Sequence, residues 1–182
     1  RDVPSVVILS GGFRETGVAG IARERSLAAV LEYEATRVIG PNCVGLMNTG
    51  SPPLNATFLE AMPPPGEIGF LSHSGALCAA VINWARQAGV GFSRIVSLGN
   101  QLDVTQTDML PSFADDPDTR VITLYLEGIE DGAAFITDFT HDFMEGLLHQ
   151  RVQPVGWLIQ NKQSGIMNQA LNYRYFLFIT HG

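Results

Sequence analysis

Residues 68–78 read Ile-Gly-Phe-Leu-Ser-His-Ser-Gly-Ala-Leu-Cys, and this stretch decides the fold. Its apolar beginning, Ile68 to Leu71, is typical of a strand that is buried on both faces, as in a parallel sheet. Two serines and a glycine follow, and they open an apolar helix that we predict from Ala76 to Ala88. A buried strand that runs directly into a helix is the repeating unit of an α/β fold.

The same alternation of strand and helix continues in both directions from this stretch. Apolar runs predict further strands at 6–9, 37–40, 95–98, 121–126 and near 155–159. Helical periodicity predicts helices at about 18–33, 105–114 and about 133–148. The proline-rich residues 49–66 should sustain neither a helix nor a central strand, and we interpret them as an ordered connection. The pattern predicts a doubly wound α/β sheet.

Composition excludes several classes of protein. The chain of 182 residues is 46% hydrophobic and only 16% charged, which excludes a disordered chain. A net charge of −7 argues against a nucleic-acid partner, because such proteins concentrate Lys and Arg. No run of 18 apolar residues predicts a membrane span, and the first residues do not resemble a signal peptide, so we expect a cytoplasmic protein. Two cysteines suggest neither a zinc site nor a disulfide framework.

Ligands of open α/β sheets bind beyond the carboxyl ends of the strands, so the turns after the strands hold the candidate site residues. The first such turn, Ser10–Gly17, is rich in glycine, and a ligand could approach its backbone amides closely. A plain tight turn explains the glycines equally well. The second, Gly40–Gly45, contains Asn42 and Cys43; Cys43 is either a nucleophile or, as we favour, part of a loop shaped by proline.

The third turn, Ser72–Gly75, opens a helix, and helix amino termini favour anions such as a phosphoryl group. The alternative is that Ser72 or Ser74 only caps the helix. His73 could be a base or a phosphate carrier, but we expect it to point to solvent. The fourth turn contains Glu127, which could orient a histidine or simply face water.

An acidic cluster around Pro117 could also hold a metal ion. It consists of Asp115, Asp116 and Asp118. A turn with an Asp cap is the better interpretation, so we predict no metal site.

Five motifs at these turns carry a resemblance to a known family. They are LSGGFRETG at 9–17, IGPNCVGLMN at 39–48, LSHSGALC at 71–78, SLGNQLDV at 97–104 and DPDTRVITLYLEGIEDGAAF at 116–135. In this order they resemble the NDP-forming acyl-CoA synthetases, the superfamily of succinyl-CoA synthetase α subunits and ADP-forming acetyl-CoA synthetases. The run LNATF at 54–58 resembles most the ligase-like module of bacterial acetyltransferase fusions.

The resemblance implies two domains and a set of site residues. Residues 1–64 would be the carboxyl-terminal part of a Rossmann-like CoA-binding domain, and residues 65–182 a flavodoxin-like domain that diverges after about residue 136. The residues implied to lie along CoA, or beside its thiol end and the acyl group, are Ser10, Gly11, Gly12, Asn42 and Cys43. The implied phosphate dock consists of Ser72, Ser74 and Gly75, and Glu127 would be the catalytic residue that holds a phosphohistidine.

The implied reaction converts acyl-CoA, a nucleoside diphosphate and phosphate into a carboxylic acid, CoA and a nucleoside triphosphate, through an acyl phosphate and a phosphohistidine. Its cofactors would be CoA and ATP or ADP, the latter bound by an ATP-grasp domain or β subunit that this chain lacks. A small carboxylic acid would be the substrate, and an oligomer is expected.

The chain also departs from the family pattern. The first half of the CoA-binding domain is absent, and the phosphohistidine segment is not found between residues 159 and 175; His141, His149 and His181 match it poorly. We therefore expect a truncated or frame-altered product that is inactive alone. Two alternatives remain open: a non-catalytic module of a protein acetyltransferase that senses CoA or acyl-CoA, and a structural subunit that completes a partner's site.

Overall fold

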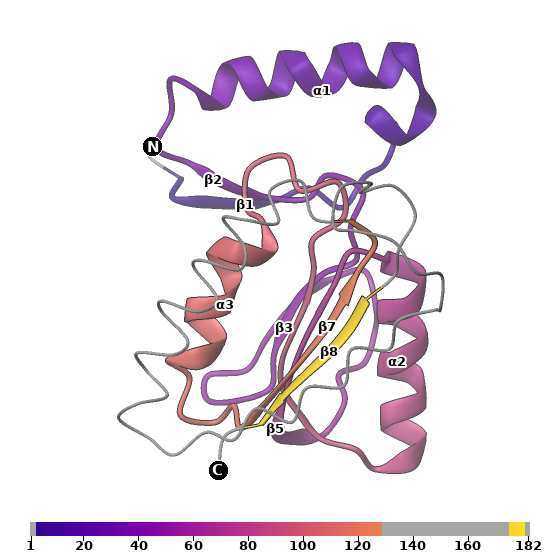
Figure 1. Cartoon of the computed structure of the whole chain (residues 1–182), viewed down its shortest axis with the longest axis vertical. Helices are drawn as coiled ribbons and strands as arrows, with labels where there is room; N and C mark the ends of the chain where they lie inside the picture. The colour runs from indigo at the N-terminus through magenta and orange to yellow at the C-terminus, as the bar shows by residue number, and fades with distance from the viewer. Residues whose placement is uncertain (1–2, 129–174, 181–182) are drawn as a thin grey trace, which may run out of the picture.

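The computed structural model describes residues 3–128 and the strand formed by residues 175–180. The first part of the chain forms a two-stranded parallel sheet from β1 (Ser5–Val7) and β2 (Arg37–Ile39). Between these strands the chain passes through the short 3-10 turn η1 (Arg14–Thr16) and helix α1 (Val18–Leu31). Figure 1 shows α1 at one end of the molecule, above β1 and β2.

The rest of the described chain forms a mixed sheet of six strands in the order β4-β3-β6-β5-β7-β8. The strands are β3 (Gly45–Asn48), β4 (Leu54–Thr57), β5 (Pro65–Ser72), β6 (Phe92–Ser97), β7 (Val121–Leu126) and β8 (Tyr175–Thr180). The central strands β6, β5 and β7 are parallel, whereas β3, β4 and β8 pair antiparallel to their neighbours. The predicted α/β class and the parallel centre of the sheet are confirmed.

Two helices connect the parallel strands and lie on opposite faces of the sheet (Figure 1). Helix α2 (Gly75–Ala88) leads from β5 to β6, and α3 (Gln106–Ala114) leads from β6 back across β5 to β7. Because the chain leaves β5 on one side and returns on the other, the strand order reverses between β5 and β7. In open α/β sheets the carboxyl ends of two such strands frame the crevice where ligands bind.

Each face of the sheet has its own apolar layer, because successive side chains of a strand point to opposite faces. On β5, Phe70 packs with the α2 residues Cys78 and Ile82, whereas its neighbour Leu71 packs on the α3 side with Phe113. The Cys78 side chain is fully buried in this layer. The two layers hold the ends of β5 and β7 in place.

Three strands were not predicted. Residues 45–57 form the β3–β4 hairpin, whose second strand lies at the sheet edge, where nearby prolines are tolerated. The hairpin pairs with β6, so part of the segment we assigned to the first domain belongs to the main sheet; the domain division itself stays a prediction. β8 was not predicted either, and the predicted helix at 133–148 and strand at 155–159 lie outside the described residues.

Within residues 3–128 and β8, no helix combines the length and the hydrophobicity that crossing a bilayer requires.

Candidate functional site at the strand ends

The turn between β5 and α2 is held by its own serines. Ser74 is the N-cap of α2, and its Oγ accepts a hydrogen bond from the Leu77 amide at 3.3 Å. The buried Ser72 hydroxyl donates to the Ser74 carbonyl oxygen at 2.9 Å and accepts from the Ser74 amide at 3.1 Å. These bonds fix where the first turn of α2 points.

The next amides of α2 remain open. Among the described residues no acceptor pairs with the backbone N–H of Gly75 or Ala76. Ala76 is exposed and Gly75 is half-buried. Two amides without partners at a helix N-terminus, with the partial positive charge of the helix dipole, form a surface that favours an anion. The predicted phosphate dock therefore has the backbone groups that it requires.

His73 is buried rather than exposed, so our expectation that it points to solvent is wrong. Its side chain and backbone are only 8% exposed, because the residue lies between the ends of β5 and β7. Its amide donates to the Tyr125 carbonyl oxygen at 3.0 Å. On its ring, Nδ1 accepts from the Glu127 amide at 3.2 Å and lies 3.3 Å from the Gln101 side-chain amide nitrogen. The imidazole thus ties the two strand ends together.

The His73 ring is neutral in this environment. Burial lowers the pKa of His73 to about 4; a weaker opposing effect comes from the Gln106 side chain, and the charge of Arg14 adds to the lowering. Because Nδ1 accepts from the Glu127 amide, the proton of the neutral ring resides on Nε2. This Nε2 is buried and has no hydrogen-bond partner among the described residues. The ring serves as an acceptor for the β7 turn, not as a cation.

Glu127 lies at the carboxyl end of β7. It directly follows β7, its backbone is anchored by His73, and it is exposed. The structure thus brings Glu127 to the same edge of the sheet as the start of α2, although 51 residues separate it from Ala76. An exposed carboxylate here can accept a hydrogen bond from an incoming imidazole.

In the glycine-rich turn Ser10–Gly17, two of the backbone amides that a ligand was expected to approach are already hydrogen-bonded. The amides of Gly12 and Phe13 both donate to Oε1 of Glu15. Burial alone would favour the neutral acid, but hydrogen bonds from the Asn100 side chain and these amides lower the pKa of Glu15 to about 2. The carboxylate of the chain itself therefore occupies the amide groups that a phosphate would need.

The two loops implied to bind CoA and the acyl group meet at Gly11. A Cβ atom on Gly11 would lie 3.1 Å from Glu15 Oε1 and 3.2 Å from Asn42 Oδ1. The Asn42 amide also donates to the Ser10 carbonyl oxygen at 3.0 Å, and Asn42 itself is exposed with a φ of 60°. The structure therefore brings together Ser10, Gly11 and Asn42.

Cys43 is not an activated thiol. It is 3% exposed, and its Sγ donates to the Ile8 carbonyl oxygen at 3.3 Å. Burial raises the pKa of the Cys43 thiol to about 11, so it is protonated at neutral pH. Because the thiolate is the reactive form, the nucleophile that the sequence left open is not supported here.

Sequence reasoning missed the residue that joins these loops. Asn100 was noted only as part of the SLGNQLDV motif at 97–104, but its side chain contacts Glu15, Glu24 and Asn42. The only local signal was a polar residue three positions after the end of a buried strand, and its partners lie 58 to 85 residues away in sequence.

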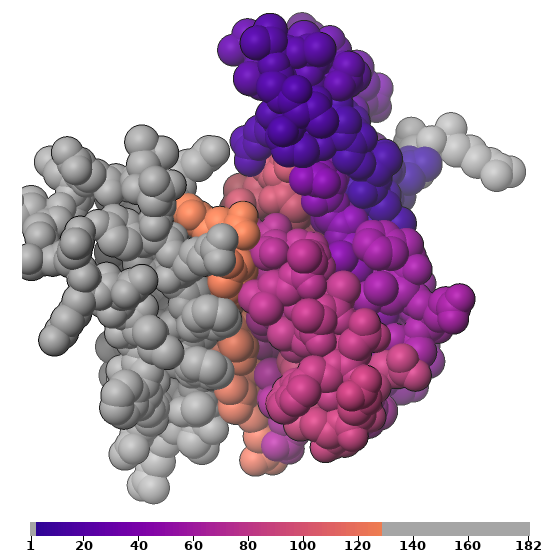
Figure 2. All heavy atoms as spheres, turned by 90° about the vertical axis from the view of Figure 1, so that its right-hand side faces the viewer, coloured from indigo at the N-terminus to yellow at the C-terminus, as the bar shows by residue number. Residues whose placement is uncertain are grey.

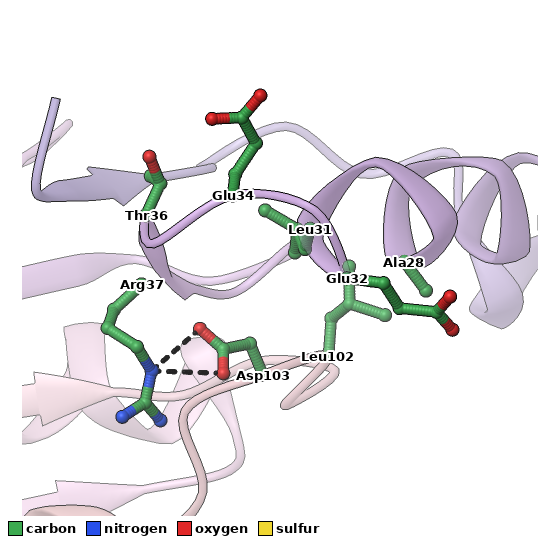
Figure 3. A pocket seen from close by; sticks show the side chains of 8 residues that line it. All are labelled: Ala28, Leu31, Glu32, Glu34, Thr36, Arg37, Leu102 and Asp103. Atoms are coloured by element: carbon green, nitrogen blue, oxygen red, sulfur yellow. Dashed lines mark hydrogen bonds and ion pairs between the residues drawn. The ribbon is translucent and has the colours of Figure 1, made fainter. Parts of the chain in front are cut away.

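A pocket of about 380 Å³ lies away from these strand ends, between the end of α1 and the Leu102–Asp103 turn (Figure 3). Its cation, Arg37, is already paired with Asp103 and Asp108 at 3.1 Å. The other charged groups that line it, Glu32 and Glu34, are acidic. The pocket therefore does not suit a phosphate.

The acidic cluster around Pro117 forms a turn. Asp116 is buried, pairs with Arg94 at 3.0 Å and accepts from the Thr119 hydroxyl at 2.7 Å. It also accepts from the Asp118 amide at 3.3 Å, as an Asp-capped turn does. In the described part of the chain no group of three acidic, His or Cys side chains is placed to hold a metal ion.

Comparisons with known proteins agree with this architecture. Residues 65–140 match the family model described as the succinyl-CoA ligase like flavodoxin domain. Over 136 residues the chain is 45% identical to the ADP-forming acetate–CoA ligase I of Archaeoglobus fulgidus. This alignment covers 75% of this chain and 20% of the relative. The chain belongs to the NDP-forming acyl-CoA synthetase superfamily. Its similarity to acetyltransferase fusions stays a prediction.

Two further members of this superfamily are close to the chain. The α subunit of the ADP-forming acetate–CoA ligase II of Pyrococcus furiosus is 41% identical over 75% of this chain and 29% of its own length. A dinucleotide-forming acetyl-coenzyme A synthetase 1 of Ca. Korarchaeum cryptofilum, solved in complex with phosphate and ADP, has a TM-score of 0.69. The two sequences are 35% identical, and the superposition covers 76% of this chain and 30% of the synthetase chain. The chain thus spans between a fifth and a third of these relatives.

Proposed function

We propose that this chain supplies the CoA- and phosphate-handling part of an acid–thiol ligase. The overall reaction converts acyl-CoA, a nucleoside diphosphate and phosphate into a carboxylic acid, CoA and a nucleoside triphosphate. One observation carries the proposal: the open amides of Gly75 and Ala76 lie at the same strand ends as Glu127. A phosphoryl donor and the group that orients its acceptor are both needed there.

The proposed chemistry has three group transfers: the first two, described next, take place on this chain, and in the third the imidazole N–P bond breaks and the phosphoryl group passes to the terminal phosphate of the nucleoside diphosphate on the nucleotide-binding partner. A phosphate oxygen attacks the acyl carbonyl carbon, the carbon–sulfur bond breaks, and CoA leaves as its thiolate. The resulting acyl phosphate then passes its phosphoryl group to an imidazole nitrogen, and the carboxylate leaves. The open amides at the start of α2 hold the phosphoryl oxygens in a dock made of Ser72, Ser74 and Gly75, where the two serine hydroxyls fix the turn. Glu127 accepts a hydrogen bond from one imidazole nitrogen, which leaves the other nitrogen as the nucleophile.

The acyl and CoA thiol groups are assigned to the loops that meet at Gly11. Ser10, Gly11 and Gly12 would lie along CoA, with Asn42 and Cys43 beside its thiol end. Because the Gly12 amide is occupied by Glu15, this loop contacts CoA through its surface and not as a phosphate cradle. Cys43 contributes as a buried wall, since its thiol stays protonated.

Other parts of the reaction are assigned outside the described residues. Of the four histidines, His73 is buried and tied to the β7 turn, so it is not the phosphorylated residue. ATP or ADP would bind an ATP-grasp domain or β subunit. The α-subunit relative of P. furiosus and the partial coverage of all reported relatives support such a partner. The solved relative that binds phosphate and ADP supports both ligands.

Ala76→Pro tests the phosphate dock most sharply. Residue 76 lies in the first turn of α2, where proline is tolerated but has no N–H to donate. Because one hydrogen bond to a charged group is worth about 1.5–3 kcal/mol, phosphate affinity should fall about ten- to a hundredfold. We expect calorimetry with inorganic phosphate to show this loss, and Ala76→Ser, which keeps the amide, to bind like the parent chain.

The same variants connect the dock to the reaction. With an ATP-grasp partner present, acetyl-CoA, ADP and phosphate should yield ATP, and Ala76→Pro should lower this rate. Equal phosphate binding by Ala76→Pro and Ala76→Ser would overturn the dock. Phosphate binding without ATP formation by the assembled pair would overturn the ligase and favour the CoA-sensing module. Gly75 is a poorer target, because a Cβ there would lie 3.3 Å from Val44 Cγ2.

A further inference from the structure

Asn100 lies three residues after the end of β6, and every polar group of its side chain forms a hydrogen bond. It is 7% exposed. Its Nδ2 donates to Oε2 of Glu15 and to Oε2 of Glu24, both at 2.8 Å. Its Oδ1 accepts from Nδ2 of Asn42 at 3.2 Å. One amide side chain therefore reaches the glycine-rich loop, helix α1 and the Gly40–Gly45 loop.

The Asn100 backbone reaches the same two loops. Its N–H donates to the Pro41 carbonyl oxygen at 2.8 Å, and its carbonyl oxygen accepts from the Arg14 guanidinium. The preceding Gly99 permits this close approach: a Cβ there would lie 2.3 Å from the Pro41 carbonyl oxygen, and its φ is +58°. The backbone and the side chain of residue 100 thus fix the same arrangement.

The chemistry of the site requires an amide. Two carboxylates, Glu15 and Glu24, converge on Nδ2, and each takes one of its two protons. Glu24 is 6% exposed and also pairs with Arg14 at 3.4 Å. An aspartate at position 100 would add a third carboxylate, and a leucine would remove the donor of both.

The consequence reaches the glycine-rich loop through Glu15. This carboxylate holds the amides of Gly12 and Phe13 with Oε1 while Oε2 is held by Asn100. The conformation of the loop and its distance from Asn42 are therefore set by the same side chain.

We propose that Asn100 is a positioning residue that sets the loop implied to bind CoA, Ser10–Gly17, against the loop implied to bind the acyl group, Gly40–Gly45. The part of this role that concerns CoA and the acyl group rests on the proposed function. The hydrogen bonds by which Asn100 links the two loops do not depend on it. Asn100 acts through Glu15 and Asn42, and it does not contact the reacting atoms.

The decisive experiment exchanges the amide of Asn100 and the carboxylate of Glu15, first singly and then together, in the full 182-residue chain. Asn100→Asp should raise the pKa of Glu15, because the hydrogen bond that stabilises its charged form is lost; carbon-detected NMR measures this pKa. The same variant should weaken CoA binding about tenfold or more, because hydrogen bonds to a charged group are lost. Adding Glu15→Gln returns an N–H donor to this contact while its Oε1 still accepts from Gly12 and Phe13. The double variant should therefore regain part of the CoA affinity.

Asn83→Asp is the matched control, because it makes the same change on the exposed face of α2. It should leave the CoA dissociation constant and the pKa of Glu15 unaltered. Unchanged CoA affinity in folded Asn100→Asp, or a double variant that binds no better than the single one, would overturn the proposal. If Asn100→Asp does not fold, Glu15→Gln alone tests the proposal. In that variant the side-chain N–H groups of the new glutamine and of Asn100 would face each other with no acceptor between them, so CoA binding must weaken.

Failure of the proposed function gives a different result. In that case the parent chain itself binds no CoA, whereas Asn100→Asp still raises the pKa of Glu15. If the pKa of Glu15 does not move, the linkage through Asn100 is refuted whether or not CoA binds.

Discussion

Helices α1 and α2 have equal length but are attached to the molecule by different forces. Helix α2 buries Cys78, Ile82 and Ala85 in the apolar layer on one face of the main sheet. Helix α1 buries only Gly20 and Glu24, and the second of these is a carboxylate held by Asn100 and Arg14. Burial of apolar area holds α2, whereas directed polar contacts hold α1.

This difference separates stability from geometry. Apolar burial contributes most of the folding free energy but is insensitive to direction, while hydrogen bonds contribute less and define angles and distances. Figure 2 shows the indigo amino-terminal part standing out beyond the body of the molecule. Several apolar side chains on or beside α1 are exposed, among them Val18, Val30 and Tyr33. The α1 unit is therefore oriented by its polar contacts with little help from a core.

The largest expected effect is a contrast between two isoleucines. Ile82 on α2 is 1% exposed, and Ile21 on α1 is 39% exposed. Ile82→Ala removes buried methyl groups and leaves a cavity, so it should lower the free energy of unfolding by about 2–5 kcal/mol. Ile21→Ala should change it by no more than about 0.5 kcal/mol. Urea titration followed by circular dichroism measures both, and equal losses would mean that α1 has a core of its own.

The next effect concerns the pH dependence of stability. The pKa of His73 is about 4 when the protein is folded and about 6.5 when it is unfolded. Between these values the unfolded chain binds a proton that the folded chain does not, so the free energy of unfolding falls as the pH falls from 6.5 to 4. A shift of this size corresponds to about 3 kcal/mol. His73→Asn, which places an acceptor where Nδ1 lies, should remove this part of the pH dependence.

The glycine-rich loop responds in a lower pH range. Because hydrogen bonding lowers the pKa of Glu15 to about 2, any stability that it contributes is lost only as the pH falls below about 4.5. Thermal melts of the parent chain and His73→Asn between pH 7 and pH 4 therefore separate the two sites. Parallel curves for both proteins would show that His73 titrates normally and is not buried between β5 and β7.

The sequence predicted the parts of the structure that depend on local pattern. The strands and helices from Ile68 to Leu126 follow from apolar runs and periodicity, and the glycine and serines at 72–75 indicate a helix start. The β3–β4 hairpin was missed because prolines near 52 and 64 argue against a strand unless it lies at an edge, which is a property of the whole sheet.

The sequence indicated the separate turns of the candidate site but not the contacts between them. Ser72, Ser74 and Gly75 are neighbours in sequence, so an anion site at the α2 start could be inferred. His73 was misplaced because its burial arises from packing against β7, 52 residues away at Tyr125. Asn100 could not be assigned, since its contacts arise only when three segments far apart in the sequence fold together.

The smallest predicted effect returns to the helix starts. Ser74 caps α2 with its hydroxyl, whereas Gly17, the N-cap of α1, makes no side-chain hydrogen bond. Ser74→Ala should therefore lower the free energy of unfolding by about 1 kcal/mol. It also releases the Leu77 amide, which adds a donor to the open amides at this helix end.

Phosphate at the dock should restore part of what Ser74→Ala loses. A ligand that binds only the folded state raises stability according to its concentration and affinity. In thermal melts with inorganic phosphate, Ser74→Ala should gain at least as much stability as the parent chain, and Ala76→Pro should gain less. If phosphate stabilises the parent chain but not Ser74→Ala, then the hydroxyl is the main ligand and the backbone amides are not, because the amides of Gly75 and Ala76 are intact in that variant.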